Sequence, residues 1–260
     1  MAGPTDGGAW IRRFHPAPQA STRLICLPHA GGSASYYFPV SRALSPLLDV
    51  LAIQYPGRQD RRGEPCVDDL RTLADLLVPL LLPWTDRPFV LFGHSMGATL
   101  AFEVAVRLAQ RGITPHGLFA SGRRAPSCFR DERVHLYSDA EFIADLKGLS
   151  GTDPQMFDDE QVVSMILPAL RSDYRAAETY RYRPTPPLAC PVVALTGDTD
   201  PQVTIDEAGT WAEHTTGPFA LGVYPGGHFF LNEHAPAVLD VIRDHVARRP
   251  LSLPRSATAG

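Results

Sequence analysis

The chain has 260 residues, of which 44% are hydrophobic and 20% are charged, and its formal net charge at pH 7 is −4. These proportions are typical of soluble globular proteins, so they exclude disordered and collagen-like chains. The small negative charge argues against a nucleic-acid partner, and the most apolar run, residues 76–82, is far shorter than the roughly 20 residues that a membrane-spanning helix needs.

The four cysteines lie far apart in the sequence and form no Cys-x-x-Cys pair. This spacing predicts free thiols in a reducing cytoplasm rather than a zinc site or a disulfide framework. Residues 1–14 contain no continuous apolar stretch, so we expect no secretory signal and a cytoplasmic protein. No metal-ligand cluster and no glycine-rich nucleotide fingerprint is present, so we expect no metal and no cofactor.

Short β-rich runs alternate with helical patterns along the chain. The predicted strands cover residues 24–27, 50–54, 89–93, 117–121, 192–196 and 219–224, and the predicted helices cover residues 69–82, 96–111, 205–214 and 235–247. This alternation predicts an α/β fold with a mostly parallel sheet and helices on both faces. The tail, residues 249–260, is rich in proline, serine and alanine and is expected to fray.

Residues 123–187 break this alternation, because they contain helical patterns but no strand pattern. One helix is expected after Ser138, which forms a capping box with Glu141, and another over residues 159–180, where Pro168 should kink or interrupt it. We interpret residues 123–187 as a helical lid inserted into a core formed by residues 1–122 and 188–248. Such an insertion would cover the edge where α/β sheets bind ligands, although the helices could also simply pack a flank.

The strongest local motif is GHSMG, which places Ser95 between Gly93 and Gly97. The motif follows an apolar strand and directly precedes a helix, which is the setting of a nucleophile elbow. A side chain at either glycine would collide in so sharp a turn, and the helix N-terminus favours negative charge at the serine. We therefore predict that Ser95 is a nucleophile.

A serine nucleophile needs a base, and His228 is the best candidate among nine histidines. It follows two glycines after the last predicted strand, whereas His234 resembles a helix cap and His94 is assigned to the pocket. The orienting acid should lie between serine and histidine in the chain. We choose Asp200 over Asp198, because Asp198 follows Gly197 closely enough to serve the turn itself.

An oxyanion hole requires two backbone N–H donors. We assign one to Met96, directly after the predicted nucleophile, and the other to Ala30 in the glycine-rich segment after the first predicted strand.

Five segments together resemble the type II thioesterases of polyketide and nonribosomal peptide synthases: LPHAGG, YPGRQDRRGEP, FGHSMGA, GDTDPQV and GGHFFL. The resemblance implies an α/β-hydrolase fold with a helical lid. It also implies a monomeric enzyme that removes stalled or aberrant acyl units from the phosphopantetheine arm of acyl or peptidyl carrier proteins. The same three catalytic residues would also serve a small-molecule carboxylesterase or an acyltransferase, including a macrocyclising domain, and an inactive binding module remains a further alternative.

Two groups of residues are assigned to substrate and partner. The expected acyl channel and pocket comprise His94, Phe157, Met165, Ile166, Leu170 and Phe229. The expected docking surface for an acidic carrier protein is a basic rim that includes Arg58, Arg123 and Arg124.

Overall fold

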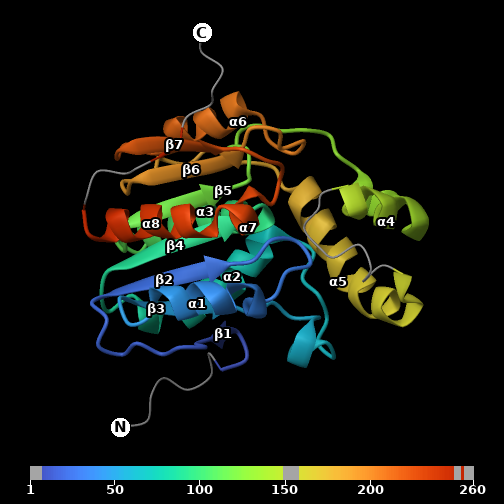
Figure 1. Cartoon of the computed structure of the whole chain (residues 1–260), viewed down its shortest axis with the longest axis horizontal. Coiled ribbons are helices and arrows are strands. Elements are labelled where there is room, and N and C mark those ends of the chain that lie inside the picture. Colours follow the sequence, from blue (N-terminus) through green and yellow to red (C-terminus); the bar gives the residue numbers. More distant parts are fainter. Residues whose placement is uncertain (1–7, 149–157, 249–252, 255–260) are drawn as a thin grey trace.

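The computed structural model describes residues 8–148, 158–248 and 253–254. Its centre is a seven-stranded sheet, with strands β1 (Ile11–Arg12), β2 (Thr22–Leu27), β3 (Leu48–Ile53), β4 (Phe89–His94), β5 (Gly117–Ser121), β6 (Val192–Gly197) and β7 (Phe219–Tyr224). The strand order is β1-β3-β2-β4-β5-β6-β7 (Figure 1). All neighbours run parallel except β1, which pairs antiparallel with β3. The six predicted strands are confirmed to within two residues, and among the described strands only the two-residue β1 was not predicted.

Helices cover both faces of the sheet. These are α1 (Phe38–Leu44), α2 (Leu70–Leu81), α3 (Met96–Ala109), α6 (Ile205–Gly209), α7 (Phe230–Glu233) and α8 (Ala235–Val246). Figure 1 shows α1 and α8 in front of the sheet and α2 and α3 behind it. The short helices α1 and α7 were not predicted, and the predicted helix 205–214 changes to a 3-10 helix after Gly209. In the described part of the chain, no helix combines the length and apolar character that a membrane crossing needs.

The hydrophobic core lies in two layers, one on each face of the sheet. In β2, Ile25 and Leu27 pack toward α2 and α3, whereas Leu24 and Cys26 pack toward α1 and α8. All six residues of β4 are buried, as expected for a strand that is covered on both faces. Because side chains within these strands are buried on both faces, we expect functional polar side chains at the ends of the strands.

Helices α4 (Asp139–Gly148) and α5 (Glu160–Thr179) lie beyond the carboxyl ends of the strands (Figure 1). They share a small apolar cluster of Phe142, Leu146 and Leu170. Pro168 was expected to kink or interrupt this helix. The structure shows no interruption, because α5 continues through Pro168 from Glu160 to Thr179. Pro168 itself is exposed, and the turn that follows it is buried against the core, which offsets the lost backbone hydrogen bond.

Candidate active site

Ser95 forms a sharp turn between β4 and α3. Its backbone angles are φ 54° and ψ −122°, a conformation that costs a non-glycine residue about 1–3 kcal/mol. A Cβ at Gly93 would lie 2.1 Å from the carbonyl oxygen of Gly97, and one at Gly97 would lie 2.1 Å from that of Leu27. Both glycines are therefore required, because the backbone itself occupies the space that their side chains would need.

His228 and Asp200 lie together at the carboxyl edge of the sheet. The His228 Nδ1 atom is 2.9 Å from one Asp200 carboxylate oxygen and 3.1 Å from the other. Both residues are buried, and the Asp200 carboxylate also accepts a hydrogen bond from the Gln202 N–H at 2.8 Å. A buried carboxylate that holds Nδ1 leaves the other ring nitrogen free to act as a base.

Asp198 has a different task. Its exposed carboxylate accepts a hydrogen bond from the Gly226 N–H at 2.9 Å, so it joins the loop after β6 to the loop that carries His228. It thereby connects two loops rather than holding its own turn.

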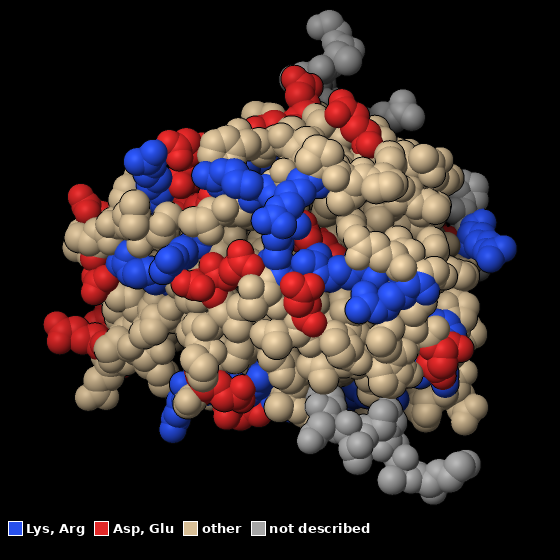
Figure 2. All heavy atoms as spheres, turned by 180° about the vertical axis from the view of Figure 1, so that it is seen from behind, with Lys and Arg blue, Asp and Glu red and all other residues tan. Residues whose placement is uncertain are grey.

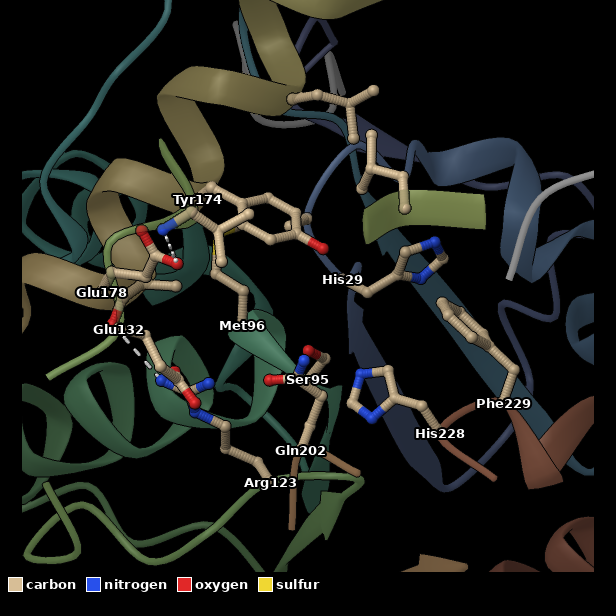
Figure 3. A pocket seen from close by; sticks show the side chains of 15 residues that line it. His29, Ser95, Met96, Arg123, Glu132, Tyr174, Glu178, Gln202, His228 and Phe229 are labelled. Carbon is tan, nitrogen blue, oxygen red and sulfur yellow. Dashed lines mark hydrogen bonds between the residues drawn. The ribbon is translucent and has the colours of Figure 1, made fainter. Parts of the chain in front are cut away.

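Ser95 and His228 line the same cavity, together with His29, Ala30 and Met96 (Figure 3). Over the described residues, no hydrogen bond joins the Ser95 hydroxyl to His228. Catalytic hydrogen bonds are often long in unliganded enzymes and shorten when substrate binds. Ala30 and Met96, the two residues that were assigned to the oxyanion hole, both line this cavity.

Two further histidines surround His228. The ring of His94 is fully buried, 5.0 Å from that of His228, and its Nδ1 lies 3.0 Å from the Ser121 hydroxyl. Burial lowers the pKa of His94 well below its ordinary value, and lowers the pKa of His29 to about 3, with nearby His228 acting in the same direction. Both rings are therefore neutral at physiological pH, and His228 is the one that faces a carboxylate.

His94 packs behind His228 and does not line the cavity that contains Ser95. Sequence reasoning missed His29, which does line it. The sequence signal for its location is that His29 directly precedes Ala30, which was assigned to the oxyanion hole.

The lid contributes one wall of the cavity, which contains both apolar and charged side chains. Six lid residues that line it were not predicted: Glu132, Val134, Leu146, Tyr174, Ala177 and Glu178. Of the predicted residues, Leu170 and Phe229 line this cavity, whereas Phe157 lies outside the described residues. Met165 and Ile166 instead line a separate groove beside Arg58, and Met165 is 55% exposed. Neither residue lines the cavity that contains Ser95, because α5 presents a different face to Ser95.

The three arginines assigned to a basic rim turn inward. Arg58 and Arg124 are 7% and 4% exposed and pair with Asp173 and Glu132, respectively. Arg123 is half-buried and donates to the Thr99 hydroxyl and the Ala177 carbonyl, and burial lowers its pKa to about 10. Arg58 and Arg124 are therefore not part of an exposed basic rim, and Arg123 lines the cavity that contains Ser95. On the face seen in Figure 2, basic and acidic side chains are interspersed instead of forming one basic patch.

The chain is similar over most of its length to known thioesterases. The family model of the thioesterase domain matches residues 22–246. Thioesterase PikA5 of Streptomyces venezuelae is 51% identical over 243 residues, which are 93% of this chain and 86% of that protein. The solved type II thioesterase BorB from the borrelidin biosynthetic cluster is 55% identical, with a TM-score of 0.88 over 94% of this chain and 100% of BorB. YbtT, a type II thioesterase from the yersiniabactin NRPS/PKS pathway, is 32% identical with a TM-score of 0.82, over 92% of this chain and 99% of YbtT.

Proposed function

From the premise that this chain belongs to the thioesterase family and is a thioester hydrolase, we propose that it removes acyl groups from the phosphopantetheine arm of acyl or peptidyl carrier proteins. Its role would be to release stalled or aberrant units from a polyketide or nonribosomal peptide synthase. The observation that carries this proposal is the Ser95 turn at a cavity that His228 also lines, with the buried Asp200 carboxylate 2.9 Å from the His228 Nδ1 atom. The full-length similarity to BorB and YbtT supports this class of substrate.

In the proposed mechanism, the Ser95 hydroxyl attacks the thioester carbonyl while His228 accepts its proton. Asp200 holds His228 in the required tautomer and stabilises the imidazolium. The N–H groups of Met96 and Ala30 bind the oxyanion of the tetrahedral intermediate. When the intermediate collapses, the carbon–sulfur bond breaks, the thiolate takes the proton from His228, and an ester to Ser95 remains. His228 then activates a water molecule that hydrolyses this ester and releases the free acid.

The lid defines the acyl side of this site. Residues 123–187 are proposed as the lid on a core of residues 1–122 and 188–248, and the working unit as a monomer. Leu146 and Leu170 offer apolar surface to the acyl chain, and Phe229 faces them from the core. The pantetheine arm would reach Ser95 from a carrier protein outside the cavity.

The test compares a carrier protein loaded with an acyl group against the matched oxygen ester of the same acyl group. We expect faster turnover of the thioester, and we expect Ser95→Ala to abolish turnover of both while its melting temperature stays near that of the wild type. Faster turnover of the oxygen ester would favour a carboxylesterase instead. Transfer of the acyl group to an added amine or alcohol, without release of the free acid, would favour an acyltransferase.

A further inference from the structure

A buried ion pair joins the lid helix α5 to the segment that follows β3. The two Arg58 Nη atoms lie 2.5 and 2.9 Å from the two carboxylate oxygens of Asp173. The two side chains are only 7% and 2% exposed. Two parallel bonds from a guanidinium to a carboxylate fix both the distance and the orientation of the partners. The pair therefore holds this turn of α5 at a defined place against the core.

The same pair also holds the glycine-rich loop after β2. The Gly31 N–H donates to the Asp173 carboxylate at 2.8 Å, and Arg58 Nη1 donates to the Gly32 carbonyl at 3.1 Å. One carboxylate oxygen of Asp173 thus accepts from both Arg58 and Gly31. Because Gly31 directly follows Ala30, a carboxylate on the lid fixes the peptide next to the proposed oxyanion donor.

We call residues 28–34 the oxyanion loop. Its two ends are held from the core, because the Tyr55 hydroxyl donates to the Pro28 carbonyl at 3.1 Å and the Gln54 side chain accepts from the Ala34 N–H at 2.9 Å. The middle of the loop depends on α5 as well. A Cβ on Gly31, whose φ is +75°, would lie 2.2 Å from Leu170 Cδ2.

We propose that Asp173, held by Arg58, is a positioning residue that sets the oxyanion loop, so that the oxyanion hole is complete only while α5 is docked on the core. This inference rests on the proposed role of the Ala30 N–H as an oxyanion donor. It gives the lid a part in catalysis, in addition to forming one wall of the cavity.

The first variant is Asp173→Asn, assayed with the small thioester acetyl-N-acetylcysteamine. We expect kcat to fall by about 10- to 100-fold, because a displaced oxyanion donor stabilises the transition state less well. KM should change by less than about twofold, because the oxyanion donor stabilises the transition state and contributes little to binding of the substrate in its ground state. Affinity for a trifluoromethyl ketone, which forms a tetrahedral adduct with Ser95, should fall by the same factor as kcat/KM.

Asp49→Asn is the matched control. Asp49 is 1% exposed, is 2.9 and 3.0 Å from Arg13 Nη2, and accepts from the Ala17 N–H at 3.1 Å. Like Asp173, it is a buried carboxylate that binds an arginine and a backbone N–H, but it lies at the start of β3, whereas Arg58 follows the end of this strand. We expect Asp49→Asn to lower the melting temperature about as much as Asp173→Asn does, but to leave kcat unchanged below that temperature.

Arg58→Lys is the second variant, and it carries the test if Asp173→Asn does not fold. It keeps the positive charge but loses the two-pronged contact, so kcat should fall by a smaller factor, again without a change in KM. The inference is overturned if both variants keep the kcat of Asp49→Asn, or if only KM changes and the ketone binds as tightly as before. If the wild-type enzyme hydrolyses the small thioester but not acyl carrier proteins, only the proposed function is contradicted. The ratio of kcat between each variant and the wild type on the small thioester would still test the role of Asp173.

Discussion

The two sides of the cavity are built by different means. On the core side, Ser95, Asp200 and His228 each follow the carboxyl end of a strand, so the hydrogen-bonded sheet sets their positions. On the lid side, Leu146 and Tyr174 come from helices that have no strand to align them. The positions of the catalytic residues are therefore set by the backbone of the sheet, whereas the shape of the pocket is set by the packing of lid side chains.

Helix α5 itself shows how this packing is distributed. All of its buried residues lie between Ala169 and Glu178, and none lies in its first nine residues. The buried half is joined to the core by Arg58 and by the Tyr180 hydroxyl, which donates to the Glu103 carboxylate at 2.7 Å. The half of α5 that faces Ser95 is therefore also the half that is anchored.

The largest expected effect tests the core side. Asp200→Asn should lower kcat for a small thioester by about 10⁴-fold, because the amide favours the wrong tautomer of His228. Asp198→Asn is the control, since its exposed side chain bonds only the neighbouring loop, and we expect kcat to fall by less than about tenfold there. Steady-state kinetics of the two variants would measure the difference. Similar losses in both would contradict the assignment of Asp200.

The second test breaks the backbone geometry directly. A Cβ at Gly97 would lie 2.1 Å from the Leu27 carbonyl oxygen, so Gly97→Ala should lower the free energy of unfolding by about 1–3 kcal/mol or more. Gly209→Ala is the matched control, because its added Cβ meets nothing within 4 Å apart from the neighbouring residues and the local helix backbone, and its own backbone is helical. Denaturant titration of both proteins gives the comparison. Equal stabilities would mean that the turn can relax around a side chain.

The core side could be predicted from the sequence because its signals are local. Each strand is a short apolar run, and Ser95, Asp200 and His228 each follow such a run within a few residues. Alternation of strands and helices then places the carboxyl ends of the strands at one edge. The edge strand β1 was not predicted, because two residues are too few to show an alternation of apolar and polar side chains.

The lid side could not be predicted in the same way. Apolar periodicity in α5 indicates that residues such as Ile166 are buried somewhere, but not that Tyr174 faces the cavity while Met165 faces solvent. Arg58 was assigned to the surface because its charge was considered alone. Its partner, Asp173, lies 115 positions further along the chain, and no local pattern links the two.

The third test concerns the neutral histidine beside the oxyanion donor. Burial, with His228 and Arg58 nearby, lowers the pKa of His29 to about 3 in the folded protein, whereas an unfolded histidine titrates near about 6.5. Below the unfolded value, the unfolded chain binds the proton and the folded chain does not, so stability falls as pH falls toward the folded value. The His29 ring alone should therefore make the free energy of unfolding change with pH by up to about 1.4 kcal/mol per pH unit.

His29→Phe removes this proton uptake and keeps an aromatic ring against Tyr36 and Phe229. We expect the free energy of unfolding of the variant to depend less steeply on pH, by up to that slope, between about pH 6 and 4. Denaturant unfolding at several pH values would measure it. Parallel curves for the wild type and the variant would show that His29 binds protons equally in both states.

The smallest expected effect separates two lid residues. Leu146 lines the cavity with Ser95, whereas Met165 lies in the outer groove. Leu146→Ala should shift the preferred acyl chain toward greater length, because each added methylene that becomes buried contributes about 0.8 kcal/mol, or about fourfold in kcat/KM. Met165→Ala should leave the preference unchanged. A series of acyl-N-acetylcysteamine thioesters of increasing length gives both profiles, and a shift caused by Met165→Ala alone would mean that the acyl chain occupies the outer groove.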